Sequence, residues 1–377
     1  MSFTFTDDQR QLADSIARYL DDKYGFEQRN KIRRGEEGWS REVWAEFAEL
    51  GFLAFPIAEE HGGLGGSTVD LALMMEAFGR ALVVEPYIAT IVLGAETIAR
   101  ADPKRAAEIL PSVASGEHLL ALAHGEPTSR YDLGRVATMA TGSDDEGWVL
   151  EGSKAVVLHG DCADTLIVSA RTGGRDDERD GVSLFLVPGD AEGLTKRAYP
   201  TIDGMRGADL ELNSVRVGPE ALLGQAGKAV DIVEAVVDRA CVALASEAVG
   251  AMAATVDLTT EYLKTRTQFG KPLGSFQVLQ HRAVEMLSET RFAHALCYRT
   301  AGLMDTTSGG DRARAASMVK AEAGRAGKMV GEEAVQLHGG MGMTDEMAVG
   351  HYFKRLRLID VTFGNAGHHL SRLVQLG

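Results

Sequence analysis

The spacing of apolar residues changes twice along this sequence, and that change restricts the fold more than any other feature. Residues 1 to about 115 place apolar side chains at helical intervals, as in Leu12, Ile16 and Leu20. Residues from about 117 to 218 carry short apolar runs bounded by Gly, Asp or Pro, which is typical of strands. From about residue 226 the helical spacing returns. The chain therefore predicts an α+β protein built from three successive parts.

The two helical regions carry additional signals. Thr6 followed by Gln9 has the pattern of a capping box, so we expect a helix to begin there. The glycine cluster at 62–66 predicts a turn between helices. Residues 273–377 contain no proline, as the long helices of a bundle require. One apolar stripe is predicted to face a core, and it consists of Val230, Val233, Val237, Cys241, Leu244 and Ala248.

The middle region predicts a small antiparallel β-barrel or sandwich. Four strand-like runs lie at 118–125, 147–160, 164–170 and 181–187. Within the second run, Glu151-Gly152-Ser153 suits a hairpin turn, and Arg171 to Gly181 predicts a charged loop. We expect an N-terminal α-helical domain over 1–116, a middle antiparallel β-barrel domain over 117–222 and a C-terminal four-helix-bundle domain over 223–377.

The composition excludes several classes of partner. The chain of 377 residues has a net charge of −15, which argues against a nucleic-acid or anionic-membrane partner. Its three cysteines, at 162, 241 and 297, lack a Cys-x-x-Cys spacing, so we expect free thiols and no metal site. The sequence shows neither a signal peptide nor a span of 18 apolar residues, and a cytoplasmic protein without membrane insertion is expected.

Two segments in the C-terminal third suggest ligand chemistry. The first runs from Arg266 through Phe269 to Gln277, where a helix should end beside an arginine and an aromatic residue. An arginine can bind a diphosphate through two hydrogen bonds, and a phenyl ring can pack on a base. The second runs from Gln336 to Gly342, where paired glycines allow a ligand to approach the backbone. Each segment alone is equally compatible with an ordinary helix C-cap.

Together, and in this order after the strand region, the two segments resemble the acyl-CoA dehydrogenase family. Glu59-Glu60-His61-Gly62-Gly63 and Glu126-Pro127 extend the resemblance over nearly the whole chain. The resemblance implies a helical domain, a β-barrel and a four-helix domain, with FAD bound between subunits. It also implies desaturation of acyl-CoA thioesters in fatty acid β-oxidation: a glutamate removes the α proton, flavin takes the β hydride, and an electron-transfer flavoprotein is the usual acceptor.

The resemblance assigns six residues to the cofactor. Arg266, Phe269 and Gln277 would hold the adenine and diphosphate end of FAD, and Gln336, Gly339 and Gly340 would approach the same region. In the family these residues reach the flavin of the neighbouring subunit. Their presence therefore implies an oligomer.

The flavin-ring motifs depart from the family pattern. The first family motif reads Thr-Glu-Pro-x-x-Gly-Ser-Asp and aligns with residues 125–132 of this chain. Here Gly125 and Tyr131 replace two residues that carry hydroxyl groups. The second family motif reads Lys-x-Trp-Ile-Thr-Asn-Gly and aligns with residues 154–160. Here Val156 replaces the tryptophan and Leu158 replaces the threonine. A flavin ring would find few polar partners here, and unmet hydrogen bonds are costly to bury.

The catalytic base departs as well. The family glutamate aligns with Phe363, which cannot accept a proton. Some members carry the base on the helix that opens the C-terminal domain, and here that position is Asp238, one methylene shorter than glutamate. The alternative interpretation of Asp238-Arg239 is an ion pair on a helix surface or interface, which we favour on geometry.

Three hypotheses follow. In the first, the chain is a subunit of a heterotetrameric dehydrogenase whose partner supplies the glutamate. Segments at 26–29, 129–133 and 156–161 resemble small subunits of such enzymes, which implies a dicarboxylyl-CoA substrate such as pimeloyl-CoA. In the second, it is a homo-oligomeric dehydrogenase that uses Asp238 as the base. In the third, it is a non-redox scaffold or acyl-CoA-binding protein.

Overall fold

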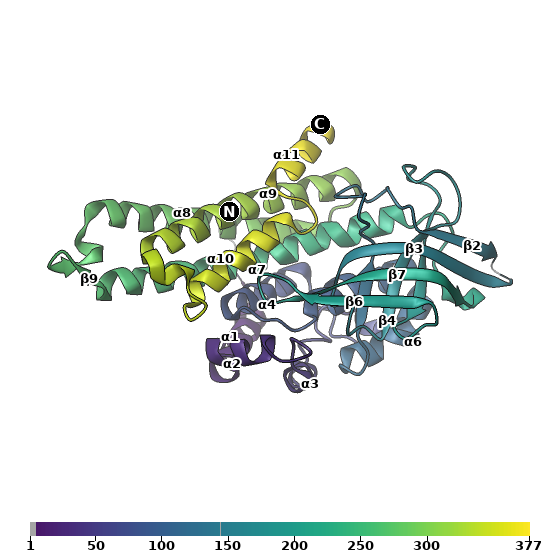
Figure 1. The fold of residues 1–377 in the computed structure, drawn as a ribbon, viewed down its shortest axis with the longest axis horizontal. Coiled ribbons are helices and arrows are strands. Elements are labelled where there is room, and N and C mark those ends of the chain that lie inside the picture. The colour runs from purple at the N-terminus through teal and green to yellow at the C-terminus, as the bar shows by residue number, and fades with distance from the viewer. Residues whose placement is uncertain (1–4, 144) are drawn as a thin grey trace. The chain divides into compact units, whose positions relative to one another are not determined.

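The computed structural model describes residues 5–143 and 145–377 (Figure 1). The chain divides into two compact units, and the division falls inside α2 (Phe26–Arg33) and α7 (Val230–Thr265). Unit 1 comprises Met1–Lys31, Ser67–Val83 and Cys241–Gly377. Unit 2 comprises Ile32–Gly66 and Val84–Ala240.

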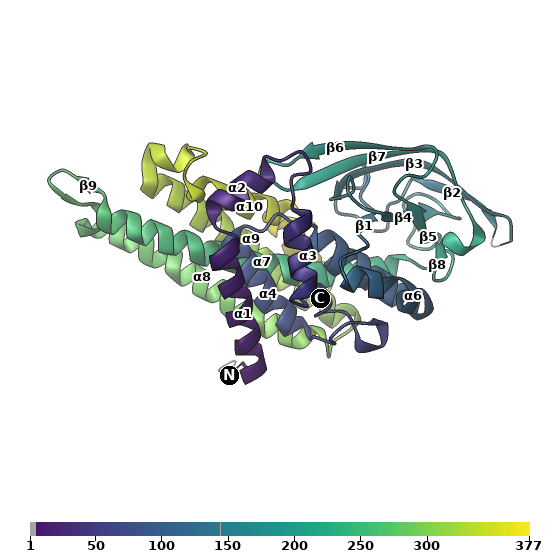
Figure 2. The ribbon, with the colours of Figure 1, turned by 90° about the horizontal axis from the view of Figure 1, so that it is seen from below.

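Unit 1 is a helical assembly. Its α9 packs against α8, α10 and α11 (Figure 1), and α1 packs against α4 (Figure 2). The predicted capping box is confirmed, because the Thr6 hydroxyl accepts a hydrogen bond from the Gln9 N–H and the Gln9 side chain accepts one from the Thr6 N–H. The helices that lie wholly in this unit are α1 (Asp7–Lys23), α4 (Thr68–Ala81), α8 (Gln277–Met304), α9 (Gly309–His338), α10 (Ala348–Val361) and α11 (Ala366–Gln375).

Helices α4 and α7 cross so closely that their backbones are in contact. A Cβ atom added to Gly250 of α7 would lie 1.8 Å from the Glu76 carbonyl oxygen, and one added to Gly79 of α4 would lie 1.9 Å from that of Glu247. Only glycine permits this approach. Next to the crossing, Arg355 of α10 donates two hydrogen bonds to the Glu247 carboxylate, at 2.5 and 2.7 Å. This buried bidentate pair ties α10 to α7.

Unit 2 combines short helices with one sheet. The helices are α3 (Arg41–Glu49), η1 (Glu59–His61), η2 (Ile88–Ala95), α5 (Glu96–Ala101), α6 (Pro103–Ala114) and η3 (Pro219–Ala221). The glycine cluster at 62–66 lies between η1 and α4, as predicted for a turn. Element η2 is a π-helix whose residues are all buried. Such π segments are rare and occur frequently at functional sites.

The sheet corrects the barrel prediction. Strands β1–β8 form one open sheet in the order β6-β7-β3-β2-β4-β5-β8, and β1 pairs with β4 in parallel. Closure would require β6 to pair with β8, which it does not do in the described part of the chain, because β8 has only two residues and β6 is largely exposed. The bounds are β1 (Leu120–Ala123), β2 (Met139–Ser143), β3 (Gly147–Leu158), β4 (Thr165–Arg171), β5 (Val182–Pro188), β6 (Leu194–Pro200), β7 (Arg206–Val217) and β8 (Leu222–Leu223).

The hairpin turn predicted at Glu151-Gly152-Ser153 is wrong. Strand β3 runs through this point, and Gly152, with φ +149°, marks a register shift in its pairing with β7. A bulge rather than a turn explains the glycine, because a bulge admits an unusual backbone conformation inside a strand. The antiparallel partner of β3 on its other side is β2, with Ser143 opposite Gly147.

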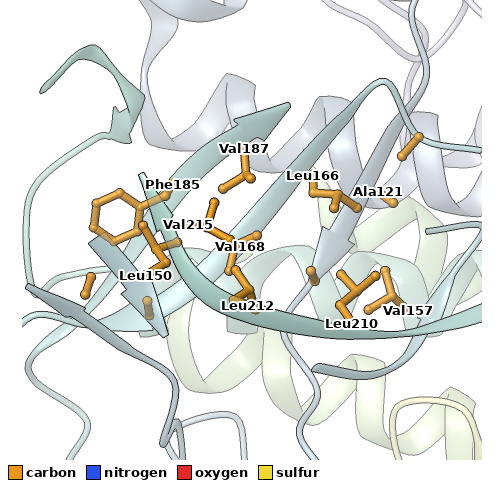
Figure 3. Packing of buried hydrophobic residues seen from close by; sticks show 14 of the residues in the cluster. Ala121, Leu150, Val157, Leu166, Val168, Phe185, Val187, Leu210, Leu212 and Val215 are labelled. Carbon is orange, nitrogen blue, oxygen red and sulfur yellow. The ribbon is translucent and has the colours of Figure 1, made fainter. Parts of the chain in front are cut away.

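The inner face of the sheet forms the core of unit 2. Phe185 and Trp148 pack with their ring centroids 5.3 Å apart. Aliphatic side chains of β3, β4, β5 and β7 belong to the same core as Phe185 (Figure 3). Alternate residues of β7, including Leu210 and Leu212, point into this core. The alternation is the period of two expected for a strand buried on one face.

Arg171 is buried, although the sequence predicts a charged loop from this residue onward. Its Nε donates to the Val136 carbonyl at 2.9 Å. Its terminal nitrogens donate to five further carbonyls, those of Gly134, Gly173, Asp176, Glu178 and Asp180. One guanidinium therefore orders the loop from 172 to 181 by satisfying its backbone acceptors.

Helix α7 is long and apolar enough to cross a membrane by length and composition alone. However, 83% of its most apolar window is buried inside the protein. The predicted stripe from Val230 to Ala248 lies in the buried part of this helix. This burial is what the central helix of a helical bundle requires.

Candidate functional site

The first predicted segment forms an exposed hairpin at the end of α7. Strands β9 (Thr267–Gln268) and β10 (Lys271–Pro272) pair antiparallel. The turn residues Phe269 and Gly270 have φ values of 53° and 79°, the sign that a tight two-residue hairpin turn requires at both positions. The Phe269 side chain is 89% exposed. The hairpin therefore presents an aromatic ring to the surroundings of unit 1.

Arg266 carries the charge of this segment. Its side chain is exposed and forms no ion pair within the described ranges 5–143 and 145–377. Its backbone is fixed: its N–H donates to the Tyr262 carbonyl and its carbonyl accepts from the Leu273 N–H, both at 2.8 Å. A guanidinium on an ordered backbone and without an acidic neighbour suits a diphosphate.

The second predicted segment follows the end of α9. Gln336 is exposed in the last turn, and η5 (Gly339–Met343) begins directly after His338. Gly339 has φ +60°, and a Cβ atom added to Gly339 or Gly340 would meet no atom within 4 Å. The backbone here borders open space, so a ligand can approach it closely.

A ring contact joins the two segments. Tyr262, in the last turns of α7, stacks on His338 with centroids 4.3 Å apart and planes inclined by 26°. The Tyr262 hydroxyl donates to the His338 carbonyl at 3.4 Å. The sequence reasoning missed both residues, although Tyr262 lies one helical turn before Arg266 and His338 directly precedes Gly339.

These residues fit the nucleotide end of FAD. Hydrogen-bond donors, an exposed aromatic ring and accessible glycine backbone occur together at the ends of α7 and α9, as a diphosphate with a base requires. All six residues assigned to the cofactor are exposed in the single chain: Arg266, Phe269, Gln277, Gln336, Gly339 and Gly340. They remain predictions as ligands of the cofactor.

The ring-facing motifs lie in unit 2 and offer few free polar groups. Val156 is 57% exposed with φ +53°, and its N–H donates to the Asp209 carboxylate at 3.0 Å. The Gly125 carbonyl accepts from the Ala155 N–H at 2.8 Å. Leu158 adds an apolar side chain. These residues fit the polar edges of a flavin ring poorly, because the Val156 N–H and the Gly125 carbonyl already have partners within the chain and the side chains of Val156 and Leu158 are apolar.

Below this surface lies a buried charge network. Lys154 Nζ is 2.7 Å from Glu126 Oε1 and 3.1 Å from Ser169 Oγ. Burial lowers the pKa of Lys154 to about 8, against the opposing effect of the Glu126 carboxylate. Burial raises the pKa of Glu126, but the Lys154 ammonium and hydrogen bonds from Thr138 outweigh it, so the pKa is lowered overall. The network fixes the segment from 124 to 126 against β3 and β4.

Asp238 is fully buried, so its interpretation as a surface residue is wrong. Arg239 forms an ion pair with Glu96 of α5, which also pairs with Arg100 at 2.6 Å. Burial raises the pKa of Glu96, but the Arg239 and Arg100 guanidiniums lower it overall. No local pattern predicts Glu96 beside Arg239, because the two residues are far apart in the chain.

Phe363 lies between α10 and α11. It has φ +57°, and its carbonyl accepts from His369 Nε2 at 3.1 Å. Lys320 Nζ donates to the carbonyls of Asp360 and Gly364, each at 2.8 Å. These hydrogen bonds fix the backbone of the loop at Phe363 and Gly364, and the Phe363 side chain itself has no acid–base group.

Comparisons with known proteins agree with this architecture. Family models match in chain order: acyl-CoA dehydrogenase N-terminal domain at 6–117, middle domain at 121–215 and C-terminal domain at 230–375. The acyl-CoA dehydrogenase FadE12 of Mycobacterium tuberculosis is 30% identical over 366 residues, covering 95% of this chain and 92% of that protein.

Solved structures agree as well. Butyryl-CoA dehydrogenase of Megasphaera elsdenii is 26% identical with a TM-score of 0.90, covering 100% of this chain and 99% of that one. The Tcur3481-Tcur3483 steroid ACAD is 28% identical with a TM-score of 0.87, and the match covers 98% of this chain and 97% of that one. The fold consists of helical N- and C-terminal domains and a middle β domain. The chain belongs to the acyl-CoA dehydrogenase family, the FAD-dependent oxidoreductases that act on CH–CH bonds.

Proposed function

We propose that this chain is the non-catalytic subunit of a hetero-oligomeric acyl-CoA dehydrogenase, in which it lends a nucleotide-binding arm to a partner subunit. The arm consists of residues 266–277 and 336–342. The partner would supply the general base and the residues that contact the flavin ring. Unit 2 of this chain would then carry no flavin of its own.

The contrast between the two halves of the candidate site carries this proposal. The arm is exposed and includes a guanidinium without an ion pair among the described residues. The motifs that would serve the chain's own flavin ring present the apolar side chains of Val156 and Leu158, and the Val156 N–H and the Gly125 carbonyl are already bonded within the chain. A ligand ring with several polar edges gains little from such a surface.

The position of the base supports the same conclusion. Phe363 replaces the family glutamate, and a phenyl ring cannot take a proton. Asp238 is the second candidate, but its side chain is fully buried in the chain, and a base must come within hydrogen-bond reach of the proton that it removes. We therefore assign the base to the partner subunit.

Four residues of the arm have defined tasks in this proposal. Bound FAD supplies the hydride acceptor for desaturation of the thioester. Arg266 would donate hydrogen bonds to its diphosphate, and Phe269 would pack against its adenine. Gly339 and Gly340 would let the backbone approach the same end, since no neighbouring atom occupies the space beside them.

The substrate and the acceptor are inferred by resemblance. Segments 26–29, 129–133 and 156–161 resemble the small subunit of pimeloyl-CoA dehydrogenase, so we propose a dicarboxylyl-CoA thioester as substrate. The Tcur3481-Tcur3483 steroid ACAD carries the names of two polypeptides, as a hetero-oligomeric arrangement would. An electron-transfer flavoprotein as acceptor and a cytoplasmic location stay predictions.

The visible absorption spectrum tests the proposal. The chain should be purified alone, and then together with the product of a neighbouring coding sequence that has glutamate at the position of Phe363. We expect a colourless protein alone. The assembled complex should be yellow, hold one FAD per pair of chains and oxidise acyl-CoA.

Two other outcomes would overturn the proposal. A chain that is yellow by itself and bleached by acyl-CoA would be a self-sufficient homo-oligomeric dehydrogenase. A chain that stays colourless and inert with every family partner, while still binding CoA thioesters, would be a scaffold or acyl-CoA-binding protein.

A further inference from the structure

The two arm segments are distant in sequence but are joined by one pair of rings. Tyr262 precedes the first segment and His338 lies within the second, directly before Gly339. The rings stack at 4.3 Å, and the Tyr262 hydroxyl donates to the His338 carbonyl. We propose that Tyr262 and His338 are positioning residues, which hold both arm segments in one arrangement for FAD. This inference rests on the proposed function of the arm.

Backbone contacts transmit the position of each ring to its segment. The Arg266 N–H donates to the Tyr262 carbonyl, so the arginine is fixed one turn beyond the tyrosine. On the other side, the Gly339 N–H donates to the Gln336 carbonyl. A Cβ atom at Gly342 would lie 2.9 Å from the Val335 carbonyl oxygen and 3.1 Å from His338 Cβ. Element η5 therefore folds back directly onto the histidine.

The environment of His338 favours a single orientation of its ring. Nδ1 donates to the Ala334 carbonyl at 2.9 Å, so Nε2 carries the lone pair. Nε2 is buried and has no hydrogen-bond partner in the described part of the chain. A protonated ring would bury a second N–H without an acceptor, and burial accordingly lowers the pKa of His338. The neutral ring, fixed by one hydrogen bond, lies flat against Tyr262.

This arrangement explains how an exposed arm can be ready for its ligand. Binding a nucleotide to two independent mobile segments would cost the ordering of both. A shared stack orders them before binding. An aromatic pair of this kind changes an equilibrium by about tenfold at most, by the usual magnitude of ring stacking.

Amide hydrogen exchange on the chain without FAD tests directly whether the stack of Tyr262 on His338 holds the two arm segments together. Tyr262→Leu removes the stack, so exchange should rise in 339–343 as well as in 266–276. Tyr262→Phe keeps the ring and should behave almost as the wild type. Phe292→Leu, on an exposed position of α8, serves as the matched control and should change neither segment. A rise confined to 266–276 would overturn the proposal.

FAD affinity in the assembled complex provides the second readout. Tyr262→Leu and His338→Leu should each weaken FAD binding by up to about tenfold, and His338→Phe should restore most of the loss. Arg266→Ala reports separately on the arm itself. If Arg266→Ala leaves FAD binding unchanged, the proposed function of the arm fails. If Arg266→Ala weakens FAD binding but the variants of Tyr262 and His338 do not, only the proposed positioning role of these two rings is wrong.

Discussion

Glu126 and Lys154 form an ion pair in the interior of unit 2, with 2.7 Å between Oε1 and Nζ. The carboxylate also accepts hydrogen bonds from the N–H groups of Ala137 and Thr138 and from the Thr138 hydroxyl. The ammonium also donates to Ser169 Oγ at 3.1 Å. One charge pair thus connects the segment around 126 with β3, β4 and the residues before β2.

Removing one partner of this pair should be costly. Lys154→Met leaves the Glu126 carboxylate buried without its counterion, and we expect a loss of about 3–5 kcal/mol in the free energy of unfolding. The double variant with Glu126→Gln should cost less than the sum of the two single changes. Urea denaturation of all four proteins measures the coupling. If the losses in the two single variants add up in the double variant, Lys154 and Glu126 are not coupled. Lys228→Met, which removes an exposed ion pair with Asp180, serves as the control.

Arg171 should be irreplaceable by lysine. Arg171→Lys removes the planar set of donors that satisfies carbonyls on both sides of the loop, and we expect a loss of roughly 3 kcal/mol or more. Limited proteolysis should show new cleavage within 172–181. Arg175→Lys, on the exposed surface of the same loop, should leave stability and cleavage unchanged. Equal behaviour of the two variants would mean that the guanidinium does not order the loop.

Gly250 should not tolerate a methyl group. Gly250→Ala places a Cβ atom against the Glu76 carbonyl, so α4 and α7 must separate, and we expect a loss of about 3 kcal/mol or failure to fold. Gly310→Ala is the matched control, because a Cβ atom there meets no atom within 4 Å. Thermal unfolding compares the two. A stable Gly250→Ala protein would contradict the close crossing of the helices.

Acid should destabilise the protein through His124. Burial, and then the Lys154 ammonium, lower the pKa of His124 to about 3. The ordinary pKa is about 6.5, so between these values the unfolded chain binds a proton that the folded chain does not. Stability should therefore fall as the pH decreases from about 6.5, by up to about 1.4 kcal/mol per pH unit from this group.

Denaturation at about pH 7 and about pH 5 measures this dependence. His124→Gln removes the group and should reduce the difference between the two pH values. His281→Gln, at an exposed position, should leave the difference unchanged. If His124→Gln does not alter the pH dependence, the buried histidine is not its source.

Asp238 should be dispensable for turnover in the assembled enzyme. Asp238→Asn keeps the size of the side chain and removes its acid–base group, so the rate should stay near that of the wild type if the partner carries the base. The measurement is steady-state oxidation of acyl-CoA together with flavin content. A loss of several orders of magnitude with flavin retained would identify Asp238 as the base.

Local patterns in the sequence were sufficient for many elements. The capping box at Thr6, the stripe from Val230 to Ala248 and the strand runs that became β1, β3, β4 and β5 follow from side-chain spacing. Strand β7 was missed, although Ala208, Leu210 and Leu212 alternate with polar residues and could have revealed it. Strand β6 gave no such signal, because it is mostly exposed and polar.

The sequence by itself determined the succession of a helical, a strand and a second helical region and located the two arm segments, because periodicity and short motifs depend on neighbours along the chain. Only the tertiary structure decided that the sheet stays open, that Arg171 and Asp238 are buried, and that Tyr262 meets His338. Each of these depends on pairing or burial between residues far apart in sequence. The free energy of such contacts comes from geometry that no local pattern encodes.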